Sequence, residues 1–309
     1  MVSVIIVAYA REDYINKCLA SVVSQSYPRI ETLVVDNSLN PKIREIIRDA
    51  YPDVRLFVQD KNIFYGAALN IGIRHSRGDY ILCLNDDVAL DKFFIEKALK
   101  GFSICENVGM VSGKILRPDR ATIDSAGLFL SLWCAPRERG YGSRDAGAFD
   151  KEGFIFGVNG AVAFYRRKTL DAIRDNDNYF DTDLSMFYED LDIAWRAQNA
   201  GWRCYYVPEA LAIHTRGASW RPSHTARRFA SLYLNDNLHT QLIKNRYLAI
   251  IKNISLLGLV GRLPFILFHD LLIWLYIVVF KPRLIKLFFY NAAILKKAVQ
   301  KRFSVGKNG

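Results

Sequence analysis

Apolar, strand-like runs alternate with helix-patterned segments over the first 115 residues, and this alternation limits the possible folds more than any other feature. The expected strands are 3–9, 30–36, 54–59, 80–84 and 108–115, and the expected helices are 12–24, 41–50, 65–75 and 91–104. The strands are nearly continuous apolar runs, which is typical of sheets that are covered on both faces. Alternating strands and helices therefore predict an α/β domain with a mostly parallel sheet.

The rest of the chain predicts a second half of this domain and then a helical region. Residues 116–165 are rich in glycine and turn residues, with short strands such as 161–165. Further elements are a helix at 188–200 before Gly201, strands at 203–207 and 210–214, an arginine-bearing loop at 216–228 and a helix from about 225 to 253. We expect a domain of residues 1–220 and a C-terminal helical region of residues 221–309.

The net charge of +11 is divided unevenly between these two parts. Residues 1–215 contain 26 Lys and Arg against 29 Asp and Glu, a net of −3, whereas residues 216–309 contain 16 against two, a net of +14. A nucleic-acid surface spread over the whole fold is therefore not expected, and no nucleic acid is predicted as a partner. With 51% hydrophobic and 24% charged residues, the chain is not a disordered one.

The five cysteines are isolated, without the spacing of a zinc ribbon or a CxxC redox motif. Isolated reduced thiols suit a cytosolic compartment. The apolar run at residues 2–9 has no basic region before it and is short for a signal peptide, so we interpret it as the first strand.

Polar clusters follow two of the expected strands at the edge where ligands of parallel sheets bind. One is Asp36-Asn37-Ser38 and the other is Asn85-Asp86-Asp87. Adjacent carboxylates there can hold a divalent cation together with a diphosphate, and Asp36 can accept the imide N–H of uracil or thymine. The same residue types also suit turns and helix caps, so both interpretations stay open.

Three later features also have both a functional and a structural interpretation. Glu189-Asp190 opens a helix, where acids favour the helix dipole or serve as a general base. Arg196 is a residue that supports another site residue, a group on the phosphate side of the site, or a solvated residue. His214 ends a strand and is either structural or a metal ligand as a neutral imidazole.

Taken in order, these segments resemble the inverting family-2 glycosyltransferases of GT-A fold. The matching segments are 3–9, 33–38, Asn62 with Asn70 and Gly72, 79–87, 156–161, 179–181 with 187–196, and 206–208 with His214. The resemblance covers residues 3–217 and includes a DXD-like triplet, Asn85-Asp86-Asp87, and an ED pair, Glu189-Asp190. The run Asp-Leu-Asp-Ile-Ala-Trp-Arg and the later Gly-Trp-Arg are similar to bacterial rhamnosyltransferase-like enzymes of surface-polysaccharide assembly.

The resemblance implies a role for each matching residue. Asp190 would be the catalytic base, and Asp87 and His214 would ligate Mg²⁺ or Mn²⁺. The implied donor-nucleotide residues are Ala8, Tyr9, Arg11, Asp36, Asn62, Asn70, Asn85 and Asp86. The implied acceptor-side residues are Gly157, Asn159, Gly160 and Glu189, and the implied diphosphate loop carries Arg216, Arg221, Arg227 and Arg228. One departure is Phe64, which stands where the family usually has glycine.

The expected function is metal-dependent, inverting transfer from a UDP- or dTDP-sugar, such as dTDP-L-rhamnose, to a hydroxyl of a glycan or polyprenyl-linked acceptor. One alternative is a nucleotidyltransferase, in which a Gly-rich, basic loop would follow the first strand. Here that place reads Ala8-Tyr9-Ala10-Arg11-Glu12-Asp13, which argues against it. A second alternative is a non-catalytic membrane- or RNA-binding protein.

The C-terminal region predicts contact with lipid. Residues 271–280 are apolar, but extending the run back to 254 brings in Arg262, Pro264, His269 and Asp270, so a clean membrane span is not expected. After Phe280 every charged residue is basic. This pattern favours helices that lie on an anionic membrane surface, and hence a cytoplasmic, peripheral protein on the inner face of the cell membrane. The alternative is a packed helical subdomain with a solvated basic face.

Overall fold

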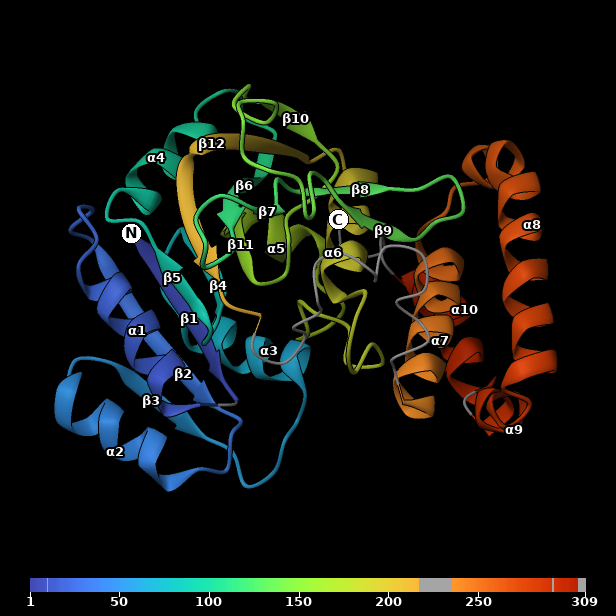
Figure 1. Cartoon of the computed structure of the whole chain (residues 1–309), viewed down its shortest axis with the longest axis horizontal. Coiled ribbons are helices and arrows are strands. Elements are labelled where there is room, and N and C mark those ends of the chain that lie inside the picture. Colours follow the sequence, from blue (N-terminus) through green and yellow to red (C-terminus); the bar gives the residue numbers. More distant parts are fainter. Residues whose placement is uncertain (10, 217–234, 291, 305–309) are drawn as a thin grey trace.

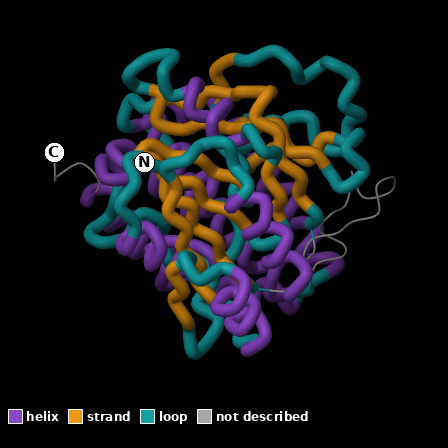
Figure 2. Tube along the Cα trace, turned by 90° about the vertical axis from the view of Figure 1, so that its left-hand side faces the viewer, coloured by secondary structure: helices purple, strands orange, loops and turns teal. Residues whose placement is uncertain are grey.

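The computed structural model describes residues 1–9, 11–216, 235–290 and 292–304, and it has a mixed α/β sheet flanked by helices (Figures 1 and 2). The order of the main sheet is β10-β12-β6-β11-β4-β1-β2-β3, with β5 on β12 and β7 on β6. Its strands are β1 (Val2–Ala8), β2 (Ile30–Asp36), β3 (Arg55–Val58), β4 (Tyr80–Asn85), β5 (Val88–Leu90), β6 (Val108–Leu116), β7 (Ile123–Ser125), β10 (Gly153–Ile155), β11 (Val162–Arg166) and β12 (Arg203–His214). A separate hairpin pairs β8 (Leu128–Leu130) with β9 (Pro136–Glu138).

Only one half of the main sheet is purely parallel. Strands β1, β2, β3 and β4 pair in parallel, as the sequence predicts. Strand β11 then enters antiparallel between β4 and β6, which makes the sheet mixed. The two short strands expected at 203–207 and 210–214 are one strand, β12, with a register shift between Val207 and Leu211.

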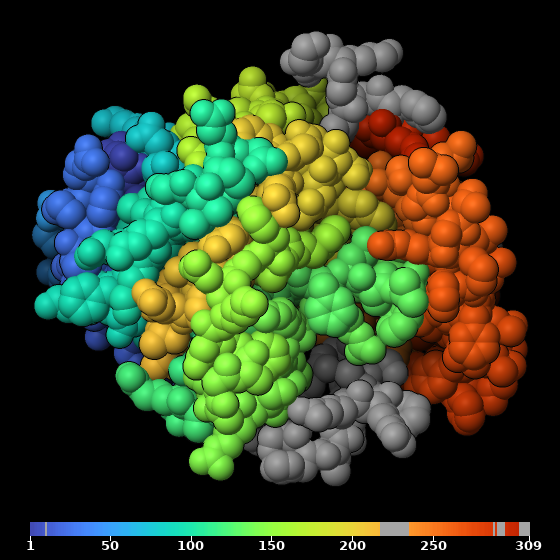
Figure 3. All heavy atoms as spheres, turned by 90° about the horizontal axis from the view of Figure 1, so that it is seen from above, coloured from blue at the N-terminus to red at the C-terminus, as the bar shows by residue number. Residues whose placement is uncertain are grey.

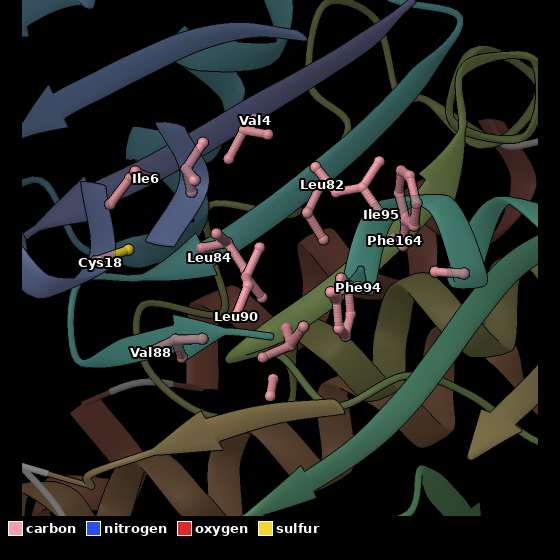
Figure 4. Close-up of a cluster of buried hydrophobic side chains, with 14 of the residues drawn as sticks. Val4, Ile6, Cys18, Leu82, Leu84, Val88, Leu90, Phe94, Ile95 and Phe164 are labelled. Atoms are coloured by element: carbon pink, nitrogen blue, oxygen red, sulfur yellow. The ribbon is translucent and has the colours of Figure 1, made fainter. Parts of the chain in front are cut away.

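The helices of the α/β domain are α1 (Glu12–Val23), α2 (Pro41–Ala50), α3 (Tyr65–His75), α4 (Phe94–Gly101), α5 (Arg167–Ile173) and α6 (Glu189–Asn199). Alternate side chains of β1 enter two different cores, since neighbouring residues of a strand point to opposite faces. Val4 and Ile6 pack with Phe94 and Phe164 (Figure 4), whereas Ile5 and Val7 pack in the second core with residues of α3 and α6. Burial on both faces explains why the strands are apolar throughout.

Four further helices pack beside this domain: α7 (Asp236–Asn253), α8 (Leu256–Phe280), α9 (Arg283–Tyr290) and α10 (Ala292–Ser304) (Figures 1 and 3). Helix α7 lies against α6, and a shared apolar cluster includes Leu191, Trp195, Leu248 and Ala298. The expected start of this helix near residue 225 lies outside the described residues, within which α7 begins after the N-cap Asn235. The expected boundary at residue 220 also lies there and stays a prediction.

The apolar segment, for which the sequence does not predict a clean membrane span, forms one unbroken helix. Helix α8 continues for 25 residues through Arg262, Pro264, His269 and Asp270. It is long and apolar enough to cross a membrane by length and composition. Asp270 pairs with Arg246 of α7, and His269 stacks on Trp133, so these two polar groups face the protein.

Candidate active site

Parallel register brings the predicted donor residues to one edge of the sheet. Ala8 lies opposite Asp36, and Val7 lies opposite Asn85, so β1, β2 and β4 end side by side. The carboxylate of Asp86 accepts a hydrogen bond from the backbone N–H of Tyr9 at 2.7 Å. This edge is the place where ligands of open α/β sheets bind.

Asp36 is fully buried at this edge, and protein groups already hold its carboxylate. Arg44 donates to Oδ2 at 2.6 Å, and Ser38 donates its backbone N–H to Oδ1 at 3.0 Å. Each carboxylate oxygen has two lone pairs, so Oδ2 keeps one acceptor position. Binding of a base N–H by Asp36 stays a prediction, and Arg44, which we did not single out from the sequence, orients it.

The two predicted asparagines of the 62–72 segment behave differently. Asn62 lies beside the edge, where its Oδ1 accepts from Asn37 and from the backbone N–H of Phe64, both at 2.8 Å. Asn70 is buried and uses its amide on the backbone of Tyr179 and Phe180. The prediction that Asn70 contacts the donor is therefore not supported, because its side chain holds the segment before α6.

Phe64 has a backbone conformation that favours glycine, with φ 65° and ψ 165°. This region is essentially restricted to glycine, and a side chain there costs about 1–3 kcal/mol. The departure noted at this position in the sequence therefore has a physical consequence: the loop keeps the glycine-type path even though the residue is phenylalanine.

Asp87, His214 and Asp124 form a line that begins after β4. Nε2 of His214 lies 3.2 Å from Oδ1 of Asp87, and Nδ1 lies 2.8 Å from Oδ2 of Asp124. Burial would lower the pKa of His214, but its hydrogen bonds to Asp124 and Asp87 outweigh this effect and raise the pKa to about 9. Asp124, which the sequence analysis missed, fixes the imidazole so that Nε2 faces Asp87.

The Asp87–His214 pair has the right chemistry for a divalent cation. A carboxylate and a neutral imidazole are ordinary ligands of such ions, so His214 would have to release its Nε2 proton to bind one. A carboxylate on the far nitrogen is the usual way of orienting a metal-binding histidine. Within the described residues no group of three or more His, Cys, Asp or Glu side chains is placed to hold a metal ion. Among the described residues, Asp87 and His214 are therefore the ones that would hold such an ion.

The predicted arginine groups near this pair are only partly placed. Arg216 donates to Asp124 and stacks on Tyr141, so Asp124 binds both His214 and Arg216. Arg221, Arg227 and Arg228 lie outside the described residues. Arg11 is exposed, where it pairs with Asp13 and stacks on Tyr14.

Asp190 lies at the start of α6 against the 156–161 segment. Gly160 donates its backbone N–H to Oδ2 at 3.1 Å, and Leu191 donates to Oδ1 at 2.7 Å. A Cβ at Gly160 would approach the carboxylate to 3.3 Å, and one at Gly157 would approach Ala194 to 2.5 Å. Both glycines therefore allow α6 to pack this closely.

Burial changes the acidity of the carboxyl groups around Asp190. It raises the pKa of Asp190, although the hydrogen bonds from Leu191 and Gly160 oppose the shift. Burial, together with the charge of Asp190, raises the pKa of Glu189 to about 8. A base with a raised pKa is better matched to proton transfer near neutral pH.

Glu138 of β9 joins the same cluster and was not singled out from the sequence. Asn159 donates to its Oε1 at 2.5 Å, and Ser125 donates to its other oxygen. Burial raises the pKa of Glu138 to about 7, the hydrogen bond from Ser125 opposes the shift, and the charge of Asp190 adds to it. Asn159 thus connects the predicted acceptor-side segment to Glu138, a carboxyl group whose pKa is raised in part by the charge of Asp190.

The 156–161 segment connects the ED pair to the end of β4: Gly160 donates to Asp190, and Asn85, two residues before Asp87, donates its backbone N–H to the carbonyl of Ala161 at 3.0 Å. Tyr65, the first residue of α3, binds the same segment. Its hydroxyl donates to the carbonyl of Gly160 at 2.8 Å. Burial raises the pKa of Tyr65, and the charges of Cys83, Glu189, Asp190 and Asp87 add to the shift.

Arg196 does not face this site. It forms a buried ion pair with Asp192 at 2.9 Å and donates to the carbonyls of Ile173 and Tyr179. The interpretation of Arg196 as a solvated residue is wrong because the side chain is buried, and its contacts agree with a supporting residue. Its role is to join α6 to the segment that precedes it.

The sequence model described as "Glycosyl transferase family 2" matches residues 3–174, more than half of the chain. The chain belongs to glycosyl transferase family 2. The match includes the sheet edge with Asp36 and Asp87, and α6 with the ED pair follows it.

Named relatives of this family-2 glycosyltransferase include two with aligned regions over most of the chain. It is 30% identical over 224 residues to an N-acetylglucosaminyltransferase of Sinorhizobium fredii, covering 68% of this chain and 52% of the relative. It is 25% identical over 258 residues to the N-acetylglucosaminyl-diphospho-decaprenol L-rhamnosyltransferase of Mycobacterium tuberculosis, covering 75% and 82%. The chain spans about half the length of some relatives, among them the first of these two.

Solved structures show the same GT-A fold. The mannosyltransferase PcManGT of Pyrobaculum calidifontis, solved with GDP-Man and Mn²⁺, aligns with a TM-score of 0.55 at 16% identity, covering 98% of this chain and 84% of that one. TarS 1–349 of S. aureus aligns with a TM-score of 0.51 at 18% identity, covering 82% and 80%. At these identities the likeness supports the fold and no finer property.

Proposed function

We propose that this protein transfers a sugar from a nucleoside-diphosphate sugar to a hydroxyl of a glycan or polyprenyl-linked acceptor, with inversion at the anomeric carbon. The observation that supports the proposal is the 156–161 segment, which connects the two predicted pairs: Gly160 donates to Asp190, and Ala161 accepts from Asn85, two residues before Asp87. UDP- and dTDP-sugars are the proposed donors, because Asp36 at the sheet edge can accept the imide N–H of either base.

In this mechanism Asp190 accepts the proton of the acceptor hydroxyl as that oxygen attacks the anomeric carbon. The nucleoside diphosphate leaves from the opposite face. Gly160 and Leu191 hold the carboxylate in place with their backbone N–H groups. Asp87 and His214 would hold Mg²⁺ or Mn²⁺, which when bound stabilises negative charge on the leaving diphosphate.

The family match and the ED pair favour this reaction over nucleotidyl transfer. Nucleotidyl transfer to a sugar phosphate needs basic groups for the incoming phosphate after the first strand. Arg11 is the basic residue described just after the first strand, and its guanidinium is paired with the carboxylate of Asp13 at 2.9 Å.

We also propose that helix α8 brings the enzyme to a membrane that carries the acceptor. Leu257, Phe268, Leu271 and Phe280 of this helix are each 65% exposed or more. Apolar side chains on so much of one helix need a cover, and the hydrocarbon of a bilayer provides it. The proposed location is thus the inner face of the cell membrane, beside a lipid-linked acceptor.

The basic residues of the C-terminal region divide into two groups, which changes the sequence-based expectation. Lys244 of α7 is buried and donates to the carbonyl of Asp183, Lys252 pairs with Asp181, and Lys301 binds Asp181 and Asp183. These charges face the α/β domain and not lipid. Four basic side chains that are exposed remain the proposed contacts to anionic headgroups: Arg283, Lys286, Lys296 and Lys297.

Donor-sugar hydrolysis by the full chain tests the proposal. The purified protein in detergent is incubated with UDP-, dTDP- and GDP-sugars, with and without Mn²⁺, and release of the nucleoside diphosphate is measured. We expect release that needs the metal and prefers one donor, and the anomeric configuration of the product, read by NMR, should be inverted. Retention of configuration would contradict the role of Asp190.

A further inference from the structure

The backbone immediately before the ED pair is strained. Phe187 and Tyr188 are consecutive non-glycine residues with φ 71° and 72°, in the left-handed region. Such conformations persist only where surrounding contacts fix them. The next two residues are Glu189 and Asp190, so whatever fixes this turn also fixes the start of α6.

Asn245 of α7 makes the contacts that fix the turn. It is fully buried, and its amide donates to the carbonyl of Met186 at 2.7 Å and to that of Phe187 at 2.9 Å. Its own Oδ1 has no hydrogen-bond partner among the described residues. The side chain therefore acts as a donor to the strained turn, while its Oδ1 is buried without a hydrogen bond among the described residues.

A second set of contacts from α7 holds the other side of Asp190. Lys252 donates to Oδ1 of Asp192 at 2.8 Å, and Asn253 donates to the same oxygen at 2.9 Å. Lys252 also bonds Asp181, where it meets Lys301 of α10. Helix α7 thus hydrogen-bonds to the chain on both sides of the proposed base, at residues 186–187 before it and at Asp192 after it.

We infer that Asn245 is a positioning residue for Asp190, so that the C-terminal helices set the geometry of the base as well as the place of the enzyme. The inference rests on the proposed function in so far as Asp190 is the base. Helix α7 ends at Asn253 and α8 begins at Leu256, so the helix proposed to enter lipid directly continues the one that holds the turn.

Asn245→Leu in the full chain tests the inference, since leucine keeps the shape and removes the donor. The first measurement is amide hydrogen exchange of residues 186–192, which needs no substrate. We expect exchange there to rise at least tenfold, with exchange in β1 and β4 unchanged. Unchanged exchange in residues 186–192 would overturn the inference, whatever the activity.

The second measurement is turnover of the donor found in the hydrolysis screen. We expect kcat to fall by about 10²-fold, as for a misplacement of about 1 Å, with the KM for the donor unchanged. A faster-exchanging turn with normal kcat would overturn the inference. If the wild-type chain hydrolyses no donor at all, the proposed function fails, while the exchange measurement still decides whether Asn245 fixes the turn.

Arg302→Met is the matched control. Arg302 of α10 also donates to two carbonyls, those of Ile251 and Ile254 at 2.8 and 2.7 Å, but both lie within the C-terminal region. We expect this variant to lower the melting temperature without changing kcat. A loss of kcat as large as that of Asn245→Leu would show a general effect of weakened helices and would overturn the specific role of Asn245.

Relief of the strain provides a rescue. Asparagine tolerates the left-handed region, so Phe187→Asn added to Asn245→Leu should restore at least part of the lost kcat. Should Asn245→Leu not fold, Asn245→Ala serves in its place, because its cavity can admit a water that reaches the same carbonyls. Full kcat in a folded Asn245→Ala variant with fast exchange at 186–192 would contradict the inference.

Discussion

The sheet edge and the C-terminal helices both depend on charged residues, but they use them in opposite ways. At the edge, short acids and a histidine lie at or just after the ends of strands, and the register of β1, β2 and β4 together with the pairing of β12 with β5 places them there. In the C-terminal region, long basic side chains leave α7 and α10 and reach acids and carbonyls of another domain. The first arrangement suits chemistry on a bound ligand, and the second suits holding two parts of a chain together.

Asp87→Asn should show the largest effect of the sheet edge. Loss of a carboxylate ligand removes metal assistance to the leaving group, and we expect turnover to fall by about 10³-fold, equivalent to several kcal/mol. Asp270→Asn is the control from the other region, since this acid pairs with Arg246. The Asp270→Asn variant should have a lower melting temperature and an unchanged kcat. If both variants lose the same amount of kcat, the two regions do not differ in the way described.

Asp124→Asn should have a smaller effect on the same pair. Without the carboxylate on Nδ1, His214 loses the group that orients Nε2 toward Asp87. Mutation of such an orienting group costs about 10–100-fold in metal affinity. Titration of Mn²⁺ in the presence of UDP measures it, and an unchanged dissociation constant would show that His214 needs no such orientation.

Leu257→Lys combined with Phe268→Lys tests the lipid role of α8. Burial of each of these side chains is worth about 1.5–3 kcal/mol, so partition onto vesicles of phosphatidylcholine and phosphatidylglycerol should fall more than tenfold. Ile104→Lys, at a residue 48% exposed after α4, is the control. Equal vesicle binding by all three proteins would contradict the membrane role, whereas donor hydrolysis in detergent should be the same for each.

Phe64→Gly should have the smallest effect, and in the stabilising direction. Removal of the side chain at φ 65° relieves strain, for a gain of about 1 kcal/mol after the entropic cost of glycine. Phe93→Gly is matched to it, because Phe93 is also 45% exposed and also precedes a helix but has φ −105°. In thermal unfolding without donor, the melting temperature of Phe64→Gly should be above that of the wild type and the melting temperature of Phe93→Gly below it.

The sequence predicts most of the α/β domain because its signals are local. Each apolar run is a strand, and Asp36, Asp87 and Asp190 lie next to their elements in the chain. Asp124 could not be found in this way, because its partner His214 is 90 residues away and the contact depends on the pairing of β7 with β6. Glu138 was missed for the same reason, since β9 belongs to a separate hairpin.

The C-terminal region was only partly predictable because composition does not say which way a long side chain points. Lys252 and Lys301 count toward the basic excess, yet both bind Asp181 of the segment before α6, and Lys252 also binds Asp192 within α6. Asn70 was misjudged similarly: its neighbours suggested a donor contact, but its amide fits the backbone of Tyr179. In each case the direction of the side chain depends on partners that are distant in the sequence.

Asp190→Asn tests the central claim most directly, with two measurements on the same sample. If Asp190 is the base, turnover of the donor in the presence of acceptor should fall by about 10²–10⁴-fold. Binding of UDP with Mn²⁺ should stay at the wild-type level, because Asp87 and His214 are untouched. Turnover near that of the wild type would contradict the account.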